Sequence, residues 1–251
     1  MDLVSVIIPY FRKKDTILES INSILKQTYK NFEIIIVYDD ENKSDLNYIK
    51  EFKNIDNRIS VIQNKENKGA GESRNIGIVN SKGKFIAFLD SDDYWKKNKL
   101  KIQLKKLNKT KADILFTAFK AINEKKKVLY SVKPPIVITY KNLIRSCPVC
   151  CSSVLIKKKC LNKIRFLNYR TKEDYDLWLR LSKKGFKIIS INNFLTFYTV
   201  RSSTLSSLHL NKVQNAYYIY SNSLKFGFFY SLFAVLRLYF NAFKKKYLAN
   251  E

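Results

Sequence analysis

The stretch FIAFLDSDDYW, residues 85–95, joins an apolar run to a group of acidic side chains. Phe85–Leu89 is continuously apolar, which predicts a strand buried on both faces. The carboxylates of Asp90, Asp92 and Asp93 follow, and crowding them costs free energy unless a cation compensates their charge. Mg²⁺ and Mn²⁺ prefer oxygen ligands and also bind phosphate oxygens. Asp90-Ser91-Asp92 is therefore predicted to bind a metal–diphosphate complex, and the alternative is a polar loop that caps the next helix.

Upstream of this motif, the chain alternates between strands and helices. Short apolar runs predict strands at residues 4–10, 32–38, 59–63 and 84–89. Apolar residues at helical spacing predict helices at residues 15–27, 44–53 and 73–80. This βαβ alternation predicts an α/β fold with a doubly wound, mostly parallel sheet. Sheets of this kind bind ligands beyond the carboxyl ends of their strands, which is where the acidic residues lie.

Downstream of the motif, the pattern predicts shorter elements. Helices are expected at residues 96–111 and 171–184, the second ended by Gly185. Strands are expected at residues 113–119, 127–132, 151–156, 187–191 and 195–200. Pro134-Pro135 marks a break between them.

Two further side chains are placed near the same edge of the sheet. Asp39 ends the second strand, where a carboxylate can accept hydrogen bonds from a base imide or a ribose hydroxyl, although a turn-forming Asp is common. Arg74 begins the helix after a glycine-bearing loop, residues 67–72. A guanidinium beside helix N-terminal amides suits anion or carbonyl recognition, and the alternative is a surface salt bridge.

A second acidic motif occurs late in the chain, in TKEDYDLWLRL, residues 171–181. Thr171 followed by Asp174 resembles a capping box at the start of a helix. Leu177 and Leu181 are expected to point to the core, which places Asp174 between core and cleft. A carboxylate held there by first-turn amides can act as a general base, and simple helix capping is the alternative.

Composition limits the class of protein. The 251 residues are 46% apolar, which excludes global disorder, and the net charge is +26, from 47 Lys and Arg against 21 Asp and Glu. Such charge favours anionic partners, unless it reflects composition bias. The eight lysines of residues 96–111 are interpreted as a solvated face. A nucleic-acid-binding protein is the rival hypothesis, which predicts salt-steep binding and no need for Asp92.

The four cysteines lie in one segment, at positions 147, 150, 151 and 160. Their spacing lacks the paired Cys-x-x-Cys motifs of a typical zinc site, so free thiols are predicted in place of metal ligands. The first nine residues show no signal peptide, which predicts a cytoplasmic protein with reduced thiols.

Residues 206–251 are expected to form a basic, aromatic-rich helical tail after a catalytic domain at residues 1–205. Phe226–Phe243 is 18 residues long, of which 14 are apolar. The polar exceptions, Gly227, Ser231, Arg237 and Asn241, fall within about 120° of one another on a helix. With Lys244–Lys246 following, this pattern predicts an amphipathic helix on an anionic membrane surface, at its inner face. Packing on the catalytic domain, or a homodimer interface, is the alternative.

Together these segments resemble bacterial family 2 glycosyltransferases, which have the GT-A fold. The resemblance covers residues 3–205 and rests on four motifs in order. They are VSVIIPYF, SILKQTYKNFEIIIVYDD, NKGAGESRNIGIVNSKGKFIAFLDSDDYW, and SSVLIKKKCLNKI followed by EDYDLWLRLSKKG. The resemblance implies an inverting, Mn²⁺- or Mg²⁺-dependent transfer from a nucleotide-diphospho-sugar donor, with UDP as the favoured nucleotide. The acceptor is expected to be a saccharide or lipid-linked saccharide in surface polysaccharide or lipooligosaccharide synthesis.

By position, the resemblance also assigns roles. Pro9 and Phe11 would border the nucleobase, Asp39 (or Asp40) would bind it, and Arg74 would lie near it. Asp90 and Ser91 would contact the donor, Asp92 would bind the metal, and Asp174 would be the catalytic base. Arg201 and His209 are candidates for a cation near the diphosphate. The family's GGF turn is replaced here by Lys163–Phe166, on the acceptor side. A family member that binds the donor without turnover is a further alternative.

Overall fold

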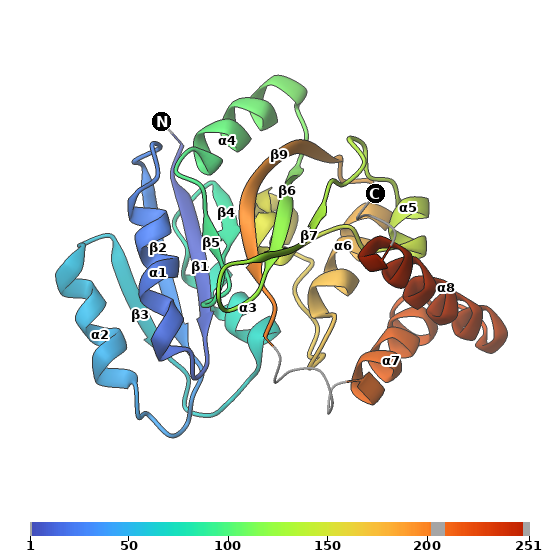
Figure 1. The fold of residues 1–251 in the computed structure, drawn as a ribbon, viewed down its shortest axis with the longest axis horizontal. Helices are drawn as coiled ribbons and strands as arrows, with labels where there is room; N and C mark the ends of the chain where they lie inside the picture. The colour runs from blue at the N-terminus through green and yellow to red at the C-terminus, as the bar shows by residue number, and fades with distance from the viewer. Residues whose placement is uncertain (1, 202–208, 248–251) are drawn as a thin grey trace.

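The computed structural model describes residues 2–201 and 209–247, with side chains for 2–201 and 211–243. A nine-stranded mixed sheet runs through the molecule in the order β3-β2-β1-β4-β8-β6-β9-β5, with β7 paired to β6. Helices cover both of its faces, and the last two helices lie together at one end of the molecule (Figure 1). This arrangement confirms the predicted α/β architecture.

The first half of the chain builds four parallel strands joined by three helices. These elements are β1 (Val4–Tyr10), α1 (Lys14–Leu25), β2 (Phe32–Tyr38), α2 (Leu46–Ile55), β3 (Ile59–Gln63), α3 (Ala70–Asn80) and β4 (Phe85–Phe88). Strand β1 pairs in parallel with both β2 and β4, and β2 pairs in parallel with β3. Their carboxyl ends therefore meet at one edge of the sheet, as expected for parallel strands.

The second half adds mostly antiparallel pairs. Its elements are β5 (Tyr94–Trp95), α4 (Lys99–Thr110), β6 (Ile114–Ile122), β7 (Val128–Val132), α5 (Tyr140–Arg145), β8 (Leu155–Lys157), α6 (Glu173–Lys183), β9 (Ile188–Thr199), α7 (His209–Tyr218) and α8 (Phe228–Tyr247). Strand β8 is antiparallel to β4 and β6, whereas β6 and β9 are parallel. The sheet is thus parallel at one side and mixed at the other.

Three predicted strands differ in the structure. The strands expected at residues 187–191 and 195–200 form one strand, β9. The exposed residues Asn192 and Asn193 are skipped in the pairing with β6, so the register shifts there and the strand continues. The strand expected from Cys151 starts only at Leu155. Cys151–Ser153 is instead a 3₁₀ turn, in which Ser153 N–H donates to the Cys150 carbonyl.

Alternate residues of the central strands pack into two cores on opposite faces of the sheet. On β1, Ile7 packs with α3, α5 and α6, whereas Val6 and Ile8 pack with α1, α2 and α4. This alternation is the period-two geometry of a strand that is buried on both faces. It explains why the parallel strands read as continuous apolar runs.

The helices after residue 208 share the core of α5 and α6. Ala216 of α7, Ile219 and Tyr220 in the π-helical turn that follows it, and Leu238 of α8 are buried there. The Tyr220 hydroxyl donates to the Ile144 carbonyl at 2.8 Å. None of the helices within the described ranges is both long and apolar enough to cross a membrane.

One lysine of α4 is not solvated as expected. Lys99 is fully buried, and its Nζ donates to Gln103 Oε1 at 2.8 Å and lies 3.9 Å from the centre of the Trp95 ring. Burial lowers the pKa of this amine well below its usual value. All four cysteines are free thiols, and Cys150, Cys151 and Cys160 are buried.

Helix α3 packs against β1 so closely that Gly77 has no space for a side chain. A Cβ at Gly77 would lie 2.4 Å from Ile7 Cγ2. We expect Gly77→Ala to lower the free energy of unfolding by about 1–3 kcal/mol, because the core must shift to admit the methyl group. Urea unfolding followed by circular dichroism measures this loss. Gly227→Ala is the matched control, since no atom lies within 4 Å of its added Cβ; equal effects of the two substitutions would contradict the packing argument.

Candidate active site

A cavity of 810 Å³ opens at the carboxyl ends of β1, β2 and β4. All seven residues predicted for donor and metal binding line this one cavity: Pro9, Phe11, Asp39, Arg74, Asp90, Ser91 and Asp92. They come from four separate segments of the chain, so their convergence is a property of the fold. Lys13, Arg170 and Glu173, which the sequence did not single out as cavity residues, also line it.

Asp39 holds the glycine loop against the end of β2. Its Oδ1 accepts hydrogen bonds from Asn64 Nδ2 at 2.7 Å and from the Lys68 N–H at 2.8 Å, and its Oδ2 accepts one from the Gly69 N–H at 2.8 Å. Gly69 has φ +84°, a left-handed conformation that suits glycine. Asp39 is therefore a structural anchor at the cavity wall.

Asp40 has a different environment from its neighbour. It accepts two hydrogen bonds from the guanidinium of Arg12, at 3.0 and 3.2 Å, and it does not line the cavity. The Arg12 hydrogen bonds lower the pKa of the Asp40 carboxyl. Of the two adjacent carboxylates, Asp39 is thus the one beside the cavity.

Arg74 joins two distant acidic residues inside the protein. It is 3% exposed, its Nη2 donates to Asp90 Oδ1 at 2.6 Å, and its Nη1 donates to Glu173 Oε1 at 2.8 Å. Arg74 lies in the second turn of α3, because this helix starts at Ala70, earlier than expected. Its alternative interpretation, a surface salt bridge, is wrong because the guanidinium is buried.

The segment Lys163–Phe166, which stands in place of the GGF turn, places an aromatic ring beside Arg74. The guanidinium carbon of Arg74 lies 5.4 Å from the centre of the Phe166 ring. Phe166 is tied to α3, because its N–H donates to Asn75 Oδ1 at 3.0 Å and its carbonyl accepts from Asn75 Nδ2 at 2.9 Å. These hydrogen bonds connect the segment that replaces the GGF turn to α3.

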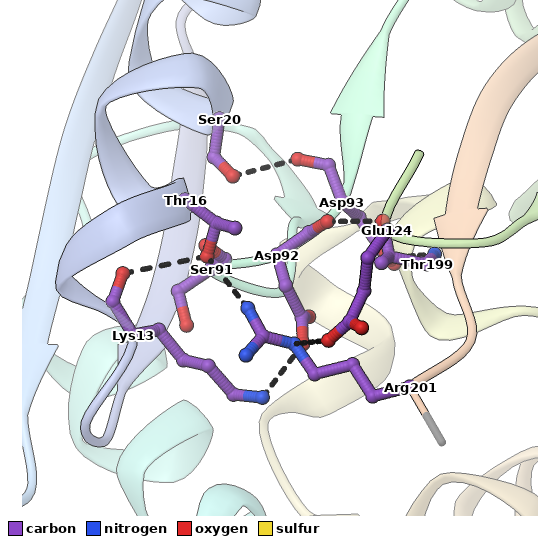
Figure 2. A network of polar contacts seen from close by, with 9 residues as sticks. All are labelled: Lys13, Thr16, Ser20, Ser91, Asp92, Asp93, Glu124, Thr199 and Arg201. Carbon is purple, nitrogen blue, oxygen red and sulfur yellow. Dashed lines mark hydrogen bonds and ion pairs between the residues drawn. The ribbon is translucent and has the colours of Figure 1, made fainter. Parts of the chain in front are cut away.

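Asp92 lies between two cations (Figure 2). Lys13 Nζ lies 3.0 Å and Arg201 Nε 3.5 Å from Asp92 Oδ2. Arg201 thus pairs with the acidic motif although it does not line the cavity, whereas the side chain of His209 lies outside the described residues.

Asp93, in contrast, points into the protein. It is 1% exposed, and it accepts hydrogen bonds from Ser152 Oγ at 2.5 Å and from the Thr199 N–H at 2.8 Å. Burial, with the charges of Asp90 and Asp92, raises the pKa of its carboxyl well above the usual value. Asp93 therefore fixes the acidic loop to β9 and leaves Asp92 at the cavity.

Helix α6 starts at Glu173, and Asp174 lies in its first turn. The predicted capping box is absent, because Thr171 Oγ1 accepts a hydrogen bond from Asn215 Nδ2 of α7 and Lys172 takes the cap position. Asp174 Oδ1 instead accepts from the Tyr175 N–H at 2.7 Å. Burial, with the charge of Glu173, raises the pKa of Asp174 to about 7, against the opposing charge of Arg74.

A family model described as Glycosyl transferase family 2 matches residues 5–164. The chain belongs to glycosyl transferase family 2. The match covers the parallel half of the sheet, the glycine loop and the acidic motif, which supply the cavity wall except for Arg170 and Glu173. The remaining part of the chain holds α6 with Asp174 and the two C-terminal helices.

Known relatives of this glycosyltransferase extend the comparison. It is 38% identical over 208 residues to the Escherichia coli UDP-Glc:alpha-D-GlcNAc-diphosphoundecaprenol beta-1,3-glucosyltransferase WfaP, covering 82% of this chain and 81% of WfaP. It is 30% identical over 245 residues to TuaG of Bacillus subtilis, a glycosyltransferase named for teichuronic acid biosynthesis, with 97% of each chain covered.

A solved structure with the same fold is the mannosyltransferase PcManGT from Pyrobaculum calidifontis, in complex with GDP-Man and Mn²⁺. The TM-score is 0.69 at 14% identity, covering 90% of this chain and 65% of the mannosyltransferase chain. This likeness confirms the GT-A fold.

Ionisation of Asp174 is expected to cost the glycosyltransferase stability. Its pKa is raised from 3.8 to about 7 on folding, so the neutral form is favoured in the folded protein and stability falls as pH rises between these values. We expect Asp174→Asn to raise Tm by several degrees at pH 8, because each kcal/mol gained in the free energy of unfolding raises Tm by about 2–4 °C.

The gain in Tm should grow from pH 5 to pH 7 and stay constant above. Thermal unfolding of the ligand-free protein at five pH values measures it. Asp56→Asn is the control, because Arg58 lowers the pKa of Asp56 to about 2 and its charge stabilises the fold. A lower Tm for Asp174→Asn at pH 8 would contradict the assigned environment.

Proposed function

We propose that this chain is an inverting glycosyltransferase that moves a sugar from a UDP-sugar to a hydroxyl of a lipid-linked saccharide, in the synthesis of a surface polysaccharide. The observation that carries the proposal is the convergence of seven acidic, basic and apolar residues on one cavity. The names of WfaP and TuaG support the donor, the lipid-linked acceptor and the class of product.

The donor would lie across the cavity, with its base near β1 and β2. Phe11 is 42% exposed and Pro9 precedes it at the end of β1, so an aromatic ring is available to pack on the base. Asp39 would bind the base or ribose at the same end. Lys13, which lines the cavity and pairs with Asp92, would face the diphosphate. Arg201 pairs with the same carboxylate from outside the cavity lining and would be a second cation near the diphosphate.

The carboxylates of the cavity fit a divalent cation that is shared with the donor. Asp90 and Asp92 offer hard oxygen ligands, and Mg²⁺ is commonly held by one or two carboxylates together with substrate phosphates. The described residues contain no group of three or more Asp, Glu, His or Cys arranged to hold an ion. When bound, Mn²⁺ or Mg²⁺ would neutralise charge on the departing diphosphate.

Asp174 is the proposed general base for the acceptor hydroxyl. A base works best when its pKa lies near the operating pH, and the pKa of Asp174 is about 7. Its neighbour Glu173 lines the donor cavity and is held by Arg74, whereas Asp174 itself, the next residue of α6, does not line the cavity. Asp174 would take the proton of the acceptor hydroxyl as its oxygen bonds to the anomeric carbon. The bond from that carbon to the diphosphate would break on the opposite face, so the carbon would be inverted.

The surface of helix α8 is evidence for an acceptor that is bound to a membrane. Its inner face holds Ser231, Ala234, Val235 and Leu238, all buried. Its outer face, between 43% and 84% exposed, consists of Phe228, Phe229, Tyr230, Leu232, Phe233, Leu236, Phe240 and Phe243. Exposed apolar surface of this extent marks an interaction site. With Lys225 before it and Lys244–Lys246 after it, we propose an anionic lipid surface as the occupant of the outer face.

Donor binding and transfer are expected to respond to different acidic residues. We expect UDP-sugars with Mn²⁺ to raise Tm of the wild type by several degrees and to give no such shift in Asp92→Asn. Asp174→Asn should keep the shift but lose at least 100-fold in transfer, because it lacks the base. Thermal shift over a panel of UDP-sugars, and a UDP-release assay with lipid-linked acceptors, measure the two effects.

Asp56→Asn, in a surface ion pair, is the control for both assays. Normal turnover by Asp174→Asn would overturn the assignment of the base. Donor binding without transfer in the wild type, across the acceptor panel, would favour a family member without turnover.

The outer face of α8 is expected to carry membrane binding. Phe229→Glu with Leu236→Glu should reduce cosedimentation with phosphatidylglycerol vesicles at least tenfold, because two charges replace side chains that are 84% and 71% exposed. Ile55→Glu, on an exposed position of α2, is the matched control. A wild-type dimer in solution that these substitutions dissociate, with vesicle binding unchanged, would assign the face to a second copy of the chain instead.

A further inference from the structure

A second cavity, of 320 Å³, lies between α8, the β6–β7 hairpin and the start of α6. Its walls include Phe119, Tyr130 and Leu238, which are apolar, and Lys172 and Tyr239, which bring polar groups. The donor cavity and this second cavity share no lining residue. The proposed function does not use the second cavity for the donor.

Three consecutive residues relate the two cavities. Glu173 lines the donor cavity, and Lys172 lines the second cavity. Asp174 follows them, and its charge acts on the Lys172 amine. Asp174 lines neither cavity, but it follows directly on one residue from each of them. An acceptor hydroxyl must reach this base from a side that the donor does not occupy.

Lys172 lacks an acidic partner in this cavity. Among the described residues it forms no ion pair, and its Nζ lies 5.0 Å from the centre of the Tyr239 ring. Burial lowers the pKa of its amine, although Cys147 and the charge of Asp174 oppose this shift. Lys172 also has φ +64°, a left-handed conformation that directs the chain into α6. An amine at a cavity wall without an ion pair is suited to bind an anion from outside the chain.

Tyr239 supplies a second polar group without a partner. Its hydroxyl is buried and forms no hydrogen bond with the described residues. Buried polar atoms in folded proteins are almost always hydrogen-bonded, so an unpaired hydroxyl at a cavity wall can be satisfied by a ligand or by water. The Tyr239 ring and the Lys172 amine are neighbours at this wall.

The other walls and the surroundings define the rest of the ligand. Phe119, Tyr130 and Leu238 would contact a hydrocarbon chain beside the anion. Helix α8 contributes Leu238 and Tyr239 to the cavity while its outer face carries exposed aromatic residues. A ligand with an anionic group next to an apolar chain therefore matches both the cavity and the proposed lipid surface.

We propose that the second cavity binds the phosphate-bearing end of a lipid-linked acceptor, with Lys172 and Tyr239 holding the phosphate. This inference rests on the proposed function, because it assigns the cavity to the acceptor of that reaction. Binding there would hold the acceptor beside the start of α6, the helix that carries Asp174.

Farnesyl diphosphate serves as a probe that carries both a phosphate group and a short lipid chain. Binding is measured by calorimetry with UDP and Mn²⁺ at saturation, so that the donor cavity is occupied. We expect the wild type to bind farnesyl diphosphate at least tenfold more tightly than farnesol or inorganic pyrophosphate. Lys172→Met should abolish this preference, Tyr239→Phe should weaken binding a few-fold, and Lys172→Arg should retain most of it.

Lys101→Met, on an exposed position of α4, is the matched control and should bind like the wild type. Equal binding of farnesyl diphosphate by the wild type and a folded Lys172→Met variant would overturn the proposal. Displacement of the probe by phosphatidylglycerol vesicles would also overturn it, because the phosphate would then come from bulk lipid. Loss of UDP binding with the probe still bound would count against the proposed function alone.

Discussion

A buried guanidinium is the interaction on which the active site depends. Arg74 of α3 holds Asp90 at the end of β4 and Glu173 at the start of α6, two residues that are 83 positions apart in sequence. Removing one partner of such a buried group typically costs about 3–5 kcal/mol, because the remaining charges lose their compensation. The same guanidinium opposes the rise in the pKa of Asp174 that burial causes. Arg74 thus joins the family-matched half of the fold to the helix that carries the proposed base.

The sequence was most informative where strands are buried on both faces. Val4–Tyr10, Phe32–Tyr38 and Ile59–Gln63 match the structure residue for residue, because turn and charged residues bound these apolar runs. Acidic residues at strand ends also predicted the cavity, since parallel strands bring their carboxyl ends together. The sequence did not predict that Glu173 lines the cavity, although Glu173 directly precedes Asp174. The reason is that its partner, Arg74, lies 99 residues away. Pairing over such a separation leaves no local pattern in a single sequence.

Lysine-rich composition gave little information about individual lysines. Within the same basic chain, Lys13 contacts the carboxylate of Asp92, Lys99 is buried against an aromatic ring, and Lys172 faces a cavity. Helical spacing predicted that the polar stripe of Phe226–Phe243 would be narrow. The structure shows that this stripe turns inward, with Ser231 buried and Asn241 Nδ2 donating to the Arg145 carbonyl. Amphipathic patterning therefore locates two faces of a helix but does not say which one meets the protein.

The cysteines provide a chemical handle that the chain already contains. Cys150, Cys151 and Cys160 are buried, and burial raises the pKa of each thiol, to about 12 for Cys160, so little reactive thiolate forms at neutral pH. Cys147 is half-buried and lines the cavity of Lys172. Thiol-directed fluorophores or spin labels would therefore attach selectively at Cys147. A chain without any substitution, labelled at that single position, could therefore report when a ligand enters beside α8.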